Sequence, residues 1–551
     1  MFRNLLVVVI ALISLFGCGK NETRILFYNG KVMTLDENNP EISSFIVENG
    51  RILATDPDQV ATLSETCSDS VDLGGQMVLP GLTDAHLHLF SLGFSLMNLD
   101  VAGERSIGSL QKKLLKFSNE NPSLQWIKGR GWDQNLWEVK EFPAFADLDK
   151  VVNDRPVVLT RIDGHAVWVN SAAMEKANIS KLTPDPAGGK ILRDATGNPT
   201  GVFIDKATEL ITNLIPEPDE KEMTQALKLA VKACNQVGLT SVHDAGTTLK
   251  EIKVLKEKLN EPWFNLRVYS LVSSDSLTWG IYKKKGTEIG LGDDRLTIRG
   301  VKIYADGALG SRGAWLLQDY SDQPGNHGLP QISQYELEKI VGEAVRCGMQ
   351  PAVHAIGDAA NQMTLDVFRK KSEQASADHR FRIEHAQIVA QKDLSRFGSE
   401  KVIASMQPVH ATSDMWWAAN RVGNERIRGG YAWRSILDDD GILSFGSDAP
   451  VESVNPFFGI YSAVNRQDHN GNPVGGWFPG EALSVKEALT AFTEGANYAG
   501  FNEKILGKIK PSFRADFIQI DQDIFEMSTS DLFKVKVLKV WFSGIPVALN
   551  W

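Results

Sequence analysis

The sequence predicts an α/β protein built on a (β/α)8 barrel, with a small β-sandwich made from both chain ends and an αβ insertion after the first barrel strand. Three observations support this prediction. Strand-like and helix-like patterns alternate through the middle of the chain, which is typical of a parallel sheet with crossover helices. Both ends consist of short runs in which apolar and polar residues alternate. The segment between the first two predicted barrel strands is too long for one crossover connection.

The first twenty residues differ in composition from the rest of the chain. Arg3 precedes the apolar run Leu5–Phe16, which is too short to span a bilayer comfortably. The run ends in the sequence LFGC, which resembles the lipobox of a bacterial lipoprotein signal. By that resemblance residues 1–18 form the signal, Cys18 becomes a lipidated N-terminus, and the protein is anchored in the bacterial cell envelope on its periplasmic or extracytoplasmic face. The alternative is a plain secretory signal with an incidental cysteine.

Charge and cysteine content exclude several classes of protein. The chain has 551 residues, a formal net charge of −10 and no long basic run, which argues against a nucleic-acid partner. Besides Cys18, only Cys67, Cys234 and Cys347 occur, and their wide spacing fits neither a disulfide framework nor a CxxC metal site. We therefore expect a globular protein that does not bind nucleic acid.

Short alternating runs at both ends of the chain predict the β-sandwich. Residues 24–35 and 44–54 alternate around Asn29-Gly30 and Asn49-Gly50, and such dipeptides are typical of hairpin turns. The C-terminal segments Ala515–Ile520 and Val535–Val547 have the same texture. We interpret residues 24–76 and 508–551 as one composite domain.

The barrel is predicted over residues 77–507, interrupted by an insertion over about residues 100–218. Its eight expected strands are Met77–His88, Gly238–Asp244, Phe264–Val272, Leu296–Ala305, Gln350–Ile356, Arg380–Ala386, Val402–Gln407 and Gly441–Gly446.

Residues with metal-ligand chemistry stand at the ends of five of these strands. His86 and His88 are two residues apart on the first strand, so their imidazoles can point to the same side. The other strand ends carry Lys302, His354, His385 and Asp448. Working residues of a (β/α)8 barrel lie at the C-terminal ends of the strands, so these groups are expected at one mouth. Each residue alone also fits a core or turn role, and the metal site is predicted from their combination.

Eight motifs make the sequence similar to the amidohydrolase superfamily, specifically the amidohydrolase-3 branch that includes N-substituted formamide deformylase-like proteins. They are PGLTDAHLH, GRGWDQ, RIDGHAVWVNS, TSVHDAG, VKIYADGALGSRGA, VHAIGD, RIEHAQ and SFGSDAP, and the resemblance covers about residues 25–545. It implies a binuclear centre with the following ligands: His86, His88 and Asp448 for one ion, His354 and His385 for the second, and a carboxylated Lys302 between them. A single ion with unmodified Lys302 is the alternative. Zinc is the expected ion, and Mn²⁺, Fe²⁺ or Co²⁺ would fit the same ligands.

The resemblance also implies a hydrolytic mechanism. A bound ion of this type lowers the pKa of water to about 7, which supplies hydroxide at neutral pH. Asp448 would take the proton as the hydroxide attacks a carbonyl and pass it to the leaving nitrogen. The second ion, or a donor such as His165, would polarise the carbonyl oxygen. The expected reaction is hydrolysis of a non-peptide C–N bond, amide or formamide-like. Further expected substrate contacts are Trp132, Asp306, Arg312 and His243. A loop salt bridge is the alternative for Asp306 and Arg312, and a place behind the metal ligands or in the pocket wall is the interpretation favoured for His243.

Three alternative functions follow from the same residues. A mononuclear deaminase of the superfamily resembles a His-x-x-Glu pattern on strand five, but His354 is followed by Ala-Ile-Gly, which lacks the glutamate. Hydrolysis of an ester, lactone or cyclic amide would use the same attacking hydroxide. A lipid-anchored binding protein would keep the metal without catalysis.

Overall fold

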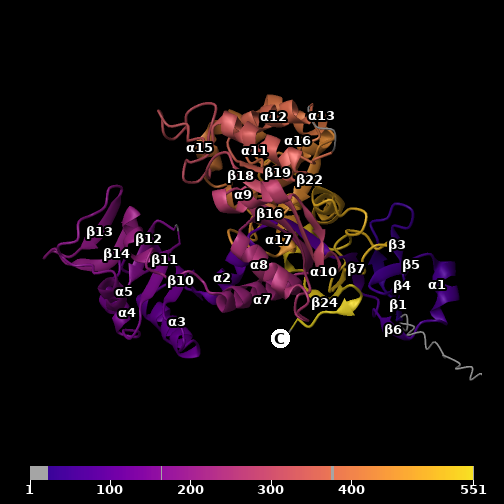
Figure 1. Ribbon diagram of the computed structural model, residues 1–551, viewed down its shortest axis with the longest axis horizontal. Helices are drawn as coiled ribbons and strands as arrows, with labels where there is room; N and C mark the ends of the chain where they lie inside the picture. The colour runs from indigo at the N-terminus through magenta and orange to yellow at the C-terminus, as the bar shows by residue number, and fades with distance from the viewer. Residues whose placement is uncertain (1–22, 163, 374–377, 550–551) are drawn as a thin grey trace, which may run out of the picture.

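The computed structural model describes residues 23–549 except residues 163 and 374–377. Its central element is a sheet of eight parallel strands in chain order, with a short antiparallel strand β17 (Glu288–Gly290) beside β18 (Figure 1). The eight strands are β8 (Leu82–Leu87), β15 (Leu239–Thr247), β16 (Arg267–Ser273), β18 (Leu296–Tyr304), β19 (Gln350–Ala355), β20 (Arg382–His385), β21 (Ile403–Met406) and β22 (Ile442–Phe445). The predicted barrel, with one strand in each expected segment, is confirmed.

Backbone contacts of the loop after β22 close the barrel against β8. The Asp448 amide donates to the His86 carbonyl at 2.7 Å, and the His88 amide donates to the Ala449 carbonyl at 2.9 Å. Gly446 begins this loop, and a Cβ there would lie 2.4 Å from the His86 nitrogen. Only glycine permits this approach. Gly446 is therefore required where the loop after β22 meets β8, and we call this junction, next to His86 and His88, the seam.

Amphipathic helices cover the outside of the barrel (Figure 1). In α7 (Glu220–Gln236) Asp219 and Glu222 form a capping box, and the buried face contains Leu227, Val231 and Cys234. The other main helices of the barrel are α8 (Leu249–Lys258), α9 (Ser276–Lys285), α11 (Gln334–Arg346), α12 (Asp358–Ser372), α14 (Pro408–Asp414), α15 (Ala418–Arg426), α16 (Trp433–Asp438) and α17 (Pro456–Asn465).

Both chain ends build the β-sandwich, as predicted. One sheet has the order β5-β4-β1-β6, and the other has the order β25-β24-β23-β7-β2-β3. The C-terminal β23 lies between β7 and β24, with Phe517 opposite both Pro80 and Trp541. Phe27 and Phe45 stack at 5.0 Å between ring centroids and meet Phe517 edge-on, which joins the two sheets through an aromatic core. The strands are β1 (Arg24–Tyr28), β2 (Lys31–Met33), β3 (Glu41–Ile42), β4 (Phe45–Glu48), β5 (Arg51–Ala54), β6 (Asp69–Asp72), β7 (Met77–Pro80), β23 (Phe517–Ile520), β24 (Val537–Phe542) and β25 (Ile545–Pro546).

One of the two predicted N-terminal hairpins is wrong. Asn49-Gly50 does join the antiparallel pair β4 and β5. Asn29-Gly30 instead connects β1 to β2, which belong to different sheets and do not pair with each other. Asn29 has a φ of 56°, and a Cβ on Gly30 would lie 2.7 Å from a Leu73 methyl carbon. The dipeptide therefore turns the chain around a sandwich corner, which needs the same left-handed backbone as a hairpin.

The predicted first strand, Met77–His88, is also two elements. Its first part is β7 of the sandwich and its second part is β8 of the barrel, and Gly81 separates them. A Cβ at Gly81 would lie 2.1 Å from the Thr240 hydroxyl oxygen. One continuous apolar run in the sequence therefore forms strands of two different sheets, and the chain passes from one sheet to the other at Gly81, where the backbone lies close to Thr240.

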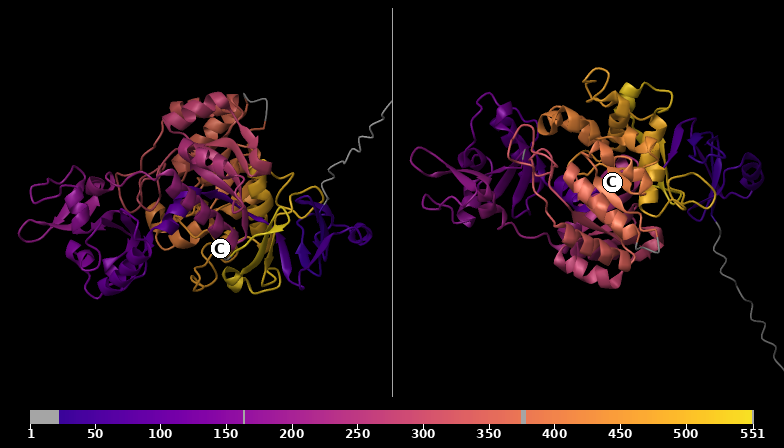
Figure 2. Two further views of the ribbon diagram at one scale, coloured as in Figure 1. Left: turned by 60° about the horizontal axis from the view of Figure 1, so that its bottom comes forward. Right: turned by 90° about the horizontal axis from the view of Figure 1, so that it is seen from above.

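The insertion forms its own mixed sheet in the order β13-β14-β12-β11-β10-β9. It follows α2 (Leu89–Met97) and precedes α7, and it lies on the side of the barrel opposite the sandwich (Figure 2). Its elements include β9 (Leu99–Asp100), α3 (Ile107–Glu120), β10 (Ile127–Trp132), α4 (Phe145–Asp149), β11 (Val157–Arg161), β12 (Ala166–Val169), α5 (Ser171–Lys176), β13 (Gly189–Arg193) and β14 (Pro199–Asp205).

Candidate metal centre

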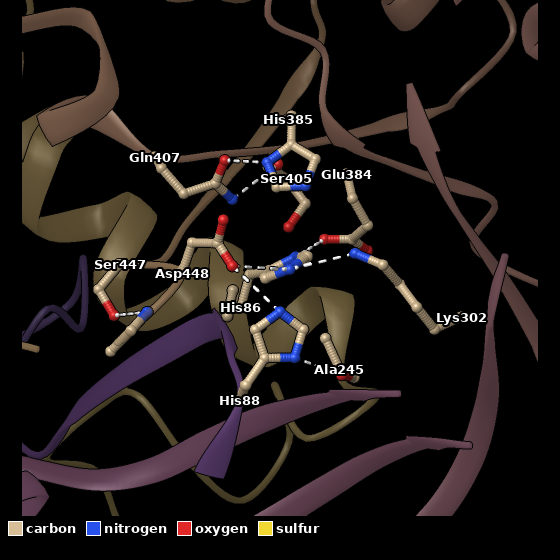
Figure 3. A network of polar contacts seen from close by, with 12 residues as sticks. His86, His88, Ala245, Lys302, Glu384, His385, Ser405, Gln407, Ser447 and Asp448 are labelled. Atoms are coloured by element: carbon tan, nitrogen blue, oxygen red, sulfur yellow. Dashed lines mark hydrogen bonds and ion pairs between the residues drawn. The ribbon is translucent and has the colours of Figure 1, made fainter. Parts of the chain in front are cut away.

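The C-terminal mouth of the barrel brings together the side chains from strands far apart in sequence (Figure 3). His86 lies near the end of β8, and His88 follows at the N-cap of α2. Lys302 lies near the end of β18, His385 ends β20, and Asp448 lies in the loop after β22. The parallel arrangement explains this convergence, because all these strands end at the same rim.

His86 and His88 present the same ring nitrogen to one carboxylate. The Asp448 Oδ1 atom lies 3.2 Å from His88 Nε2 and 3.6 Å from His86 Nε2. His88 Nδ1 is 2.7 Å from the carbonyl oxygen of Ala245, so that nitrogen donates and holds the ring in place. Ligands bound at about 2.0–2.2 Å from one ion lie about 3–3.6 Å apart, so these three atoms match a shared divalent cation.

A buried carboxylate orients His86 from the other side of its ring. Glu384 accepts a hydrogen bond from His86 Nδ1, and Arg382 Nη2 donates to Glu384 at 3.1 Å. Arg382 also contacts Ser405 Oγ at 2.8 Å and His243 Nδ1 at 3.0 Å. Burial alone would raise the pKa of Glu384, but Arg382, His86 and Lys302 together outweigh it and hold that pKa well below its usual value. The structure thus places His243, an expected substrate contact, in the network behind the metal ligands.

The neutral state of the histidines suits metal binding. Burial, followed by the charge of Lys302, lowers the pKa of His86 to about 4. The same two causes lower the pKa of His354 to about 3. Burial would raise the pKa of Asp448, but hydrogen bonding to His88 and the nearby rings hold it well below the ordinary value. Near pH 7 the site therefore offers neutral imidazoles at His86 and His354 and an ionised carboxylate, which are the forms that bind metals. His88 differs, because the hydrogen bond to Asp448 and its charge act against burial and raise the pKa of His88.

Asp84 fixes the loop that carries Asp448. Its carboxylate accepts from the Ser447 hydroxyl at 2.5 Å and from the His86 amide at 3.0 Å. Burial raises the pKa of Asp84 to about 7, against these hydrogen bonds. Asp448 itself has a φ of 59°, a left-handed conformation that aspartate tolerates better than most residues. Asp84 thereby ties the first and last strands together directly behind the ligands.

Lys302 is fully buried between the two sides of the centre. Its Nζ lies 3.1 Å from His86 Nε2 and 5.3 Å from the ring centroid of Tyr304. Burial lowers the pKa of Lys302 to about 8, against the opposing charges of Glu384 and Asp448. A lysine in this state has a substantial neutral fraction near physiological pH, and the neutral amine is the form that reacts with carbon dioxide.

His354 and His385 form the second side of the centre. Their ring centroids are 4.5 Å apart. His385 Nδ1 is 2.8 Å from Gln407 Oε1, which leaves Nε2 to face the mouth. His354 Nε2 lies 3.6 Å from Asp306 Oδ1, which is too long for a hydrogen bond, so this nitrogen has no hydrogen-bond partner among the described residues.

Asp306 and Arg312, both expected substrate contacts, organise the loop after β18. Asp306 is completely buried, and burial raises its pKa to about 7. Three backbone amides donate to its carboxylate at 2.8–3.0 Å, those of Trp315, Ile356 and Gly357. Arg312 makes two hydrogen bonds to Asp322, at 3.1 and 2.8 Å. Both side chains therefore have protein hydrogen-bond partners, and neither needs a substrate to explain its position.

Both expected residues of the insertion contact other residues of the insertion. His165 lies between β11 and β12, its side chain is largely exposed, and its Nδ1 is 3.0 Å from Asp205 Oδ1. Trp132 is fully buried beside Trp137 and Trp168, and its indole donates to the Leu159 carbonyl at 2.7 Å. In this arrangement Trp132 packs the insertion core, and the catalytic role of His165 stays a prediction.

Sequence reasoning missed His410. It lies in the first turn of α14, which directly follows β21, so it stands at the same rim as the other ligands. Its Nε2 lies 3.8 Å from Asp448 Oδ2, and its ring is nearly parallel to that of His385 at 6.1 Å. The signal was available, because the segment Pro-Val-His immediately follows a predicted barrel strand.

The donor set fits a divalent cation. Within the described residues, three buried atoms of the mouth have no hydrogen-bond partner: Asp448 Oδ1, His354 Nε2 and His410 Nε2. Such buried polar atoms cost free energy unless something binds them. Asp448 Oδ1 lies close to the Nε2 atoms of both imidazoles, and a cation shared by these three atoms would stabilise the arrangement.

Barrel, sandwich and histidine-rich mouth together define a metal-dependent hydrolase. A solved structure from Pyrococcus horikoshii OT3, described as an uncharacterized metal-dependent hydrolase, superposes with a TM-score of 0.78 at 29% identity, covering 92% of this chain and 99% of that one. Residues 69–548 match the amidohydrolase family, and the chain belongs to it. The putative amidohydrolase YtcJ of Bacillus subtilis (strain 168) is 31% identical over 95% of this chain and 98% of its own. The N-substituted formamide deformylase of Arthrobacter pascens is 26% identical over 95% and 97%.

Proposed function

We propose that this protein hydrolyses a non-peptide C–N bond, amide or formamide-like, in a small molecule. The observation that carries the proposal is the position of Asp448, whose Oδ1 lies 3.2 and 3.6 Å from the two imidazoles of the HLH motif. A carboxylate so placed can bind an ion and also exchange a proton with a water on that ion. The likeness to an enzyme named N-substituted formamide deformylase supports the choice of bond.

The ligands divide between two ion positions. His86, His88 and Asp448 would hold the first ion, and His354 and His385 would hold the second. When bound, a divalent ion such as Zn²⁺ lowers the pKa of water and polarises a carbonyl. Glu384 keeps the Nε2 atom of His86 directed into the site by accepting the hydrogen of Nδ1.

Asp448 performs the proton transfers. Its carboxylate accepts a proton from the attacking water as the water oxygen bonds to the carbonyl carbon. It then returns that proton to the amide nitrogen as the C–N bond breaks. The products are a carboxylic acid and an amine, so atoms and protons balance without a further reactant. The low pKa of Asp448 keeps it ionised and ready to accept.

Lys302 would supply the anionic bridge between the ions after carboxylation. An ammonium group has no lone pair and cannot bind a cation, whereas a carbamate has two oxygens. Its burial and lowered pKa of about 8 favour the neutral amine that this reaction requires. The carbamate would also replace an unfavourable buried cation with an anion facing the ions.

Hydrolysis of defined amides by the zinc-loaded protein tests the proposal. The substrates are N-formyl and N-acetyl derivatives of benzylamine, with the acid and amine products both quantified. Asp448→Asn and His88→Ala should lower kcat/KM at least about 10³-fold, because each removes a group that acts only with the ion. His327→Ala, an exposed histidine of a loop, serves as the control. Turnover of the corresponding esters or lactones without any turnover of amides would contradict the choice of bond.

We further propose that the mature protein is held at the cell envelope through a lipidated Cys18. That cysteine lies outside the described residues, and within them no helix has the length and apolar character needed to cross a membrane. The experiment is phase partitioning of the protein expressed in a bacterium, compared with Cys18→Ser. The wild type should enter the detergent phase and the variant the aqueous phase. A wild type found in the aqueous phase would contradict the anchor.

A further inference from the structure

Among the described residues, His410 is a histidine at the rim of the barrel mouth to which the ligand scheme above gives no task. Six groups already serve the two ion positions: His86, His88, Lys302, His354, His385 and Asp448. His410 stands at the edge of this set, on the first turn of α14, and its side chain is 13% exposed. An unpaired polar group at the rim of a barrel mouth is a candidate for contact with substrate or with an ion.

The surroundings of His410 favour a hydrogen-bond donor that is available to a ligand. Its Nε2 is buried and has no hydrogen-bond partner among the described residues. The nearest carboxylate oxygen, Asp448 Oδ2, is 3.8 Å away, which is too long for a hydrogen bond. That oxygen nevertheless favours the tautomer with the hydrogen on Nε2, because a lone pair there would face a negative charge. The donor is thus present and not consumed.

The position of His410 also fits the reacting group. Asp448 exposes its two oxygens to different partners, Oδ1 to the HLH pair and Oδ2 to His410. A substrate carbonyl attacked by a water beside Oδ1 must place its carbon near this carboxylate. His410 reaches the same space from a neighbouring element, whereas His165 lies in the insertion next to Asp205.

We infer that His410 is a catalytic residue that donates a hydrogen bond from Nε2 to the carbonyl oxygen of the bound amide and to the oxyanion formed on it. This inference rests on the proposed amide hydrolysis. It gives His410 the electrophilic task that the sequence suggested for His165. Because the donor is fixed on a helix, it needs little reorganisation as negative charge develops.

The inference predicts a loss confined to the transition state. Removing one oxyanion donor costs about 10²–10³-fold in kcat. His410→Ala should show this loss with little change in KM, and a phosphonate analogue of the tetrahedral intermediate should bind more weakly by the same factor. His410→Gln, which keeps an N–H donor, should recover part of both. His327→Ala, at an exposed loop histidine, is the control, and its kcat should stay within about threefold of the wild type.

Metal analysis separates this role from that of a ligand. His385, His410 and Asp448 offer ligand atoms within 4.8 Å of one another, so a direct contact of His410 with an ion is the competing explanation. Under the inference, His410→Ala binds as many zinc ions as the wild type with unchanged affinity. A lost or weakened ion in that variant would overturn the inference. Unchanged kcat and unchanged phosphonate affinity would also overturn it. So would a rise in KM as large as the fall in kcat, in a variant whose thermal melting curve is unchanged. If the wild type binds zinc but cleaves no amide, the proposed function fails, and the His410 inference fails with it. If the wild type cleaves amides and His410→Ala cleaves them equally well, the inference fails but the proposed function stands.

Discussion

Replacement of Glu384 by glutamine tests whether a buried network orients the metal ligands. Glu384 is fully buried, accepts from His86 Nδ1, and forms an ion pair with Arg382 Nε at 2.5 Å. The variant Glu384→Gln keeps the shape but removes the charge. One terminal atom becomes an N–H donor, and it must face a donor of either His86 or Arg382.

The magnitude follows from what remains around Arg382. Its other contacts include Ser405 Oγ and the Ala85 carbonyl, both at 2.8 Å and both neutral. Loss of one partner of a buried ion pair costs about 3–5 kcal/mol, because the other charge stays buried. For the metal, loss of an outer-shell partner costs about 10–100-fold in affinity, which corresponds to about 1.4–2.8 kcal/mol.

The assay combines denaturant unfolding of the metal-free proteins with a zinc titration against a competing chelator. Glu503→Gln is the matched control, since Glu503 accepts two hydrogen bonds of 2.8 Å from Arg380 but is partly exposed and outside the mouth. We expect the control to lose about 1 kcal/mol of stability and no zinc affinity. Wild-type zinc affinity in Glu384→Gln would refute the orienting role, even if the variant were less stable.

Three further predictions concern the seam, the lysine and acid stability. Gly446→Ala should lose zinc binding and unfold at lower denaturant, because its Cβ would lie 2.4 Å from the His86 nitrogen, whereas Gly108→Ala meets no atom within 4 Å and should gain about 0.5–1 kcal/mol. If Lys302 is carboxylated, dissolved carbon dioxide should speed zinc reconstitution of the metal-free protein. At a fixed concentration of carbon dioxide the effect should be larger above the lysine pKa of about 8 than below it, and Lys302→Met should abolish it. Hydrogen bonds from two lysines and a tyrosine outweigh burial and lower the pKa of Glu288 to about 2, so its stabilisation is present above about pH 4.5 and lost as the pH falls toward 2. Glu288→Gln should therefore flatten the acid limb of a stability–pH curve by about 1–2 kcal/mol, and an unchanged limb would contradict the assignment.

The barrel strands were predictable because their signals are local. Each expected segment contains the observed strand within a few residues, and the rule that strand C-termini share one rim placed the candidate ligands together. The same logic applied to the strand at residues 403–406 would have found His410. The Asn-Gly signals were local too, but Asn29-Gly30 shows their limit, because the same turn geometry serves a hairpin and a sandwich corner.

Features that depend on distant partners were not predictable from one sequence. The bond between His86 and Glu384 joins residues 298 positions apart. Burial of Trp132 among other tryptophans depends on the packing of the insertion, which local patterns do not reveal. Asp306 looked free to meet substrate in the loop after β18, and only the fold shows that three backbone amides occupy its carboxylate.

The closure of the barrel and the position of Asp448 depend on the same few interactions. Gly446 permits the close approach, Asp84 binds Ser447, and the Asp448 amide bonds to the carbonyl of His86. A change in any of them moves the carboxylate and opens the seam together, so stability and zinc affinity should fall in parallel. His410 is carried by a separate helix and takes no part in this seam. Its substitution should therefore affect catalysis without the stability loss, and that contrast distinguishes a residue that acts on substrate from one that holds the site together.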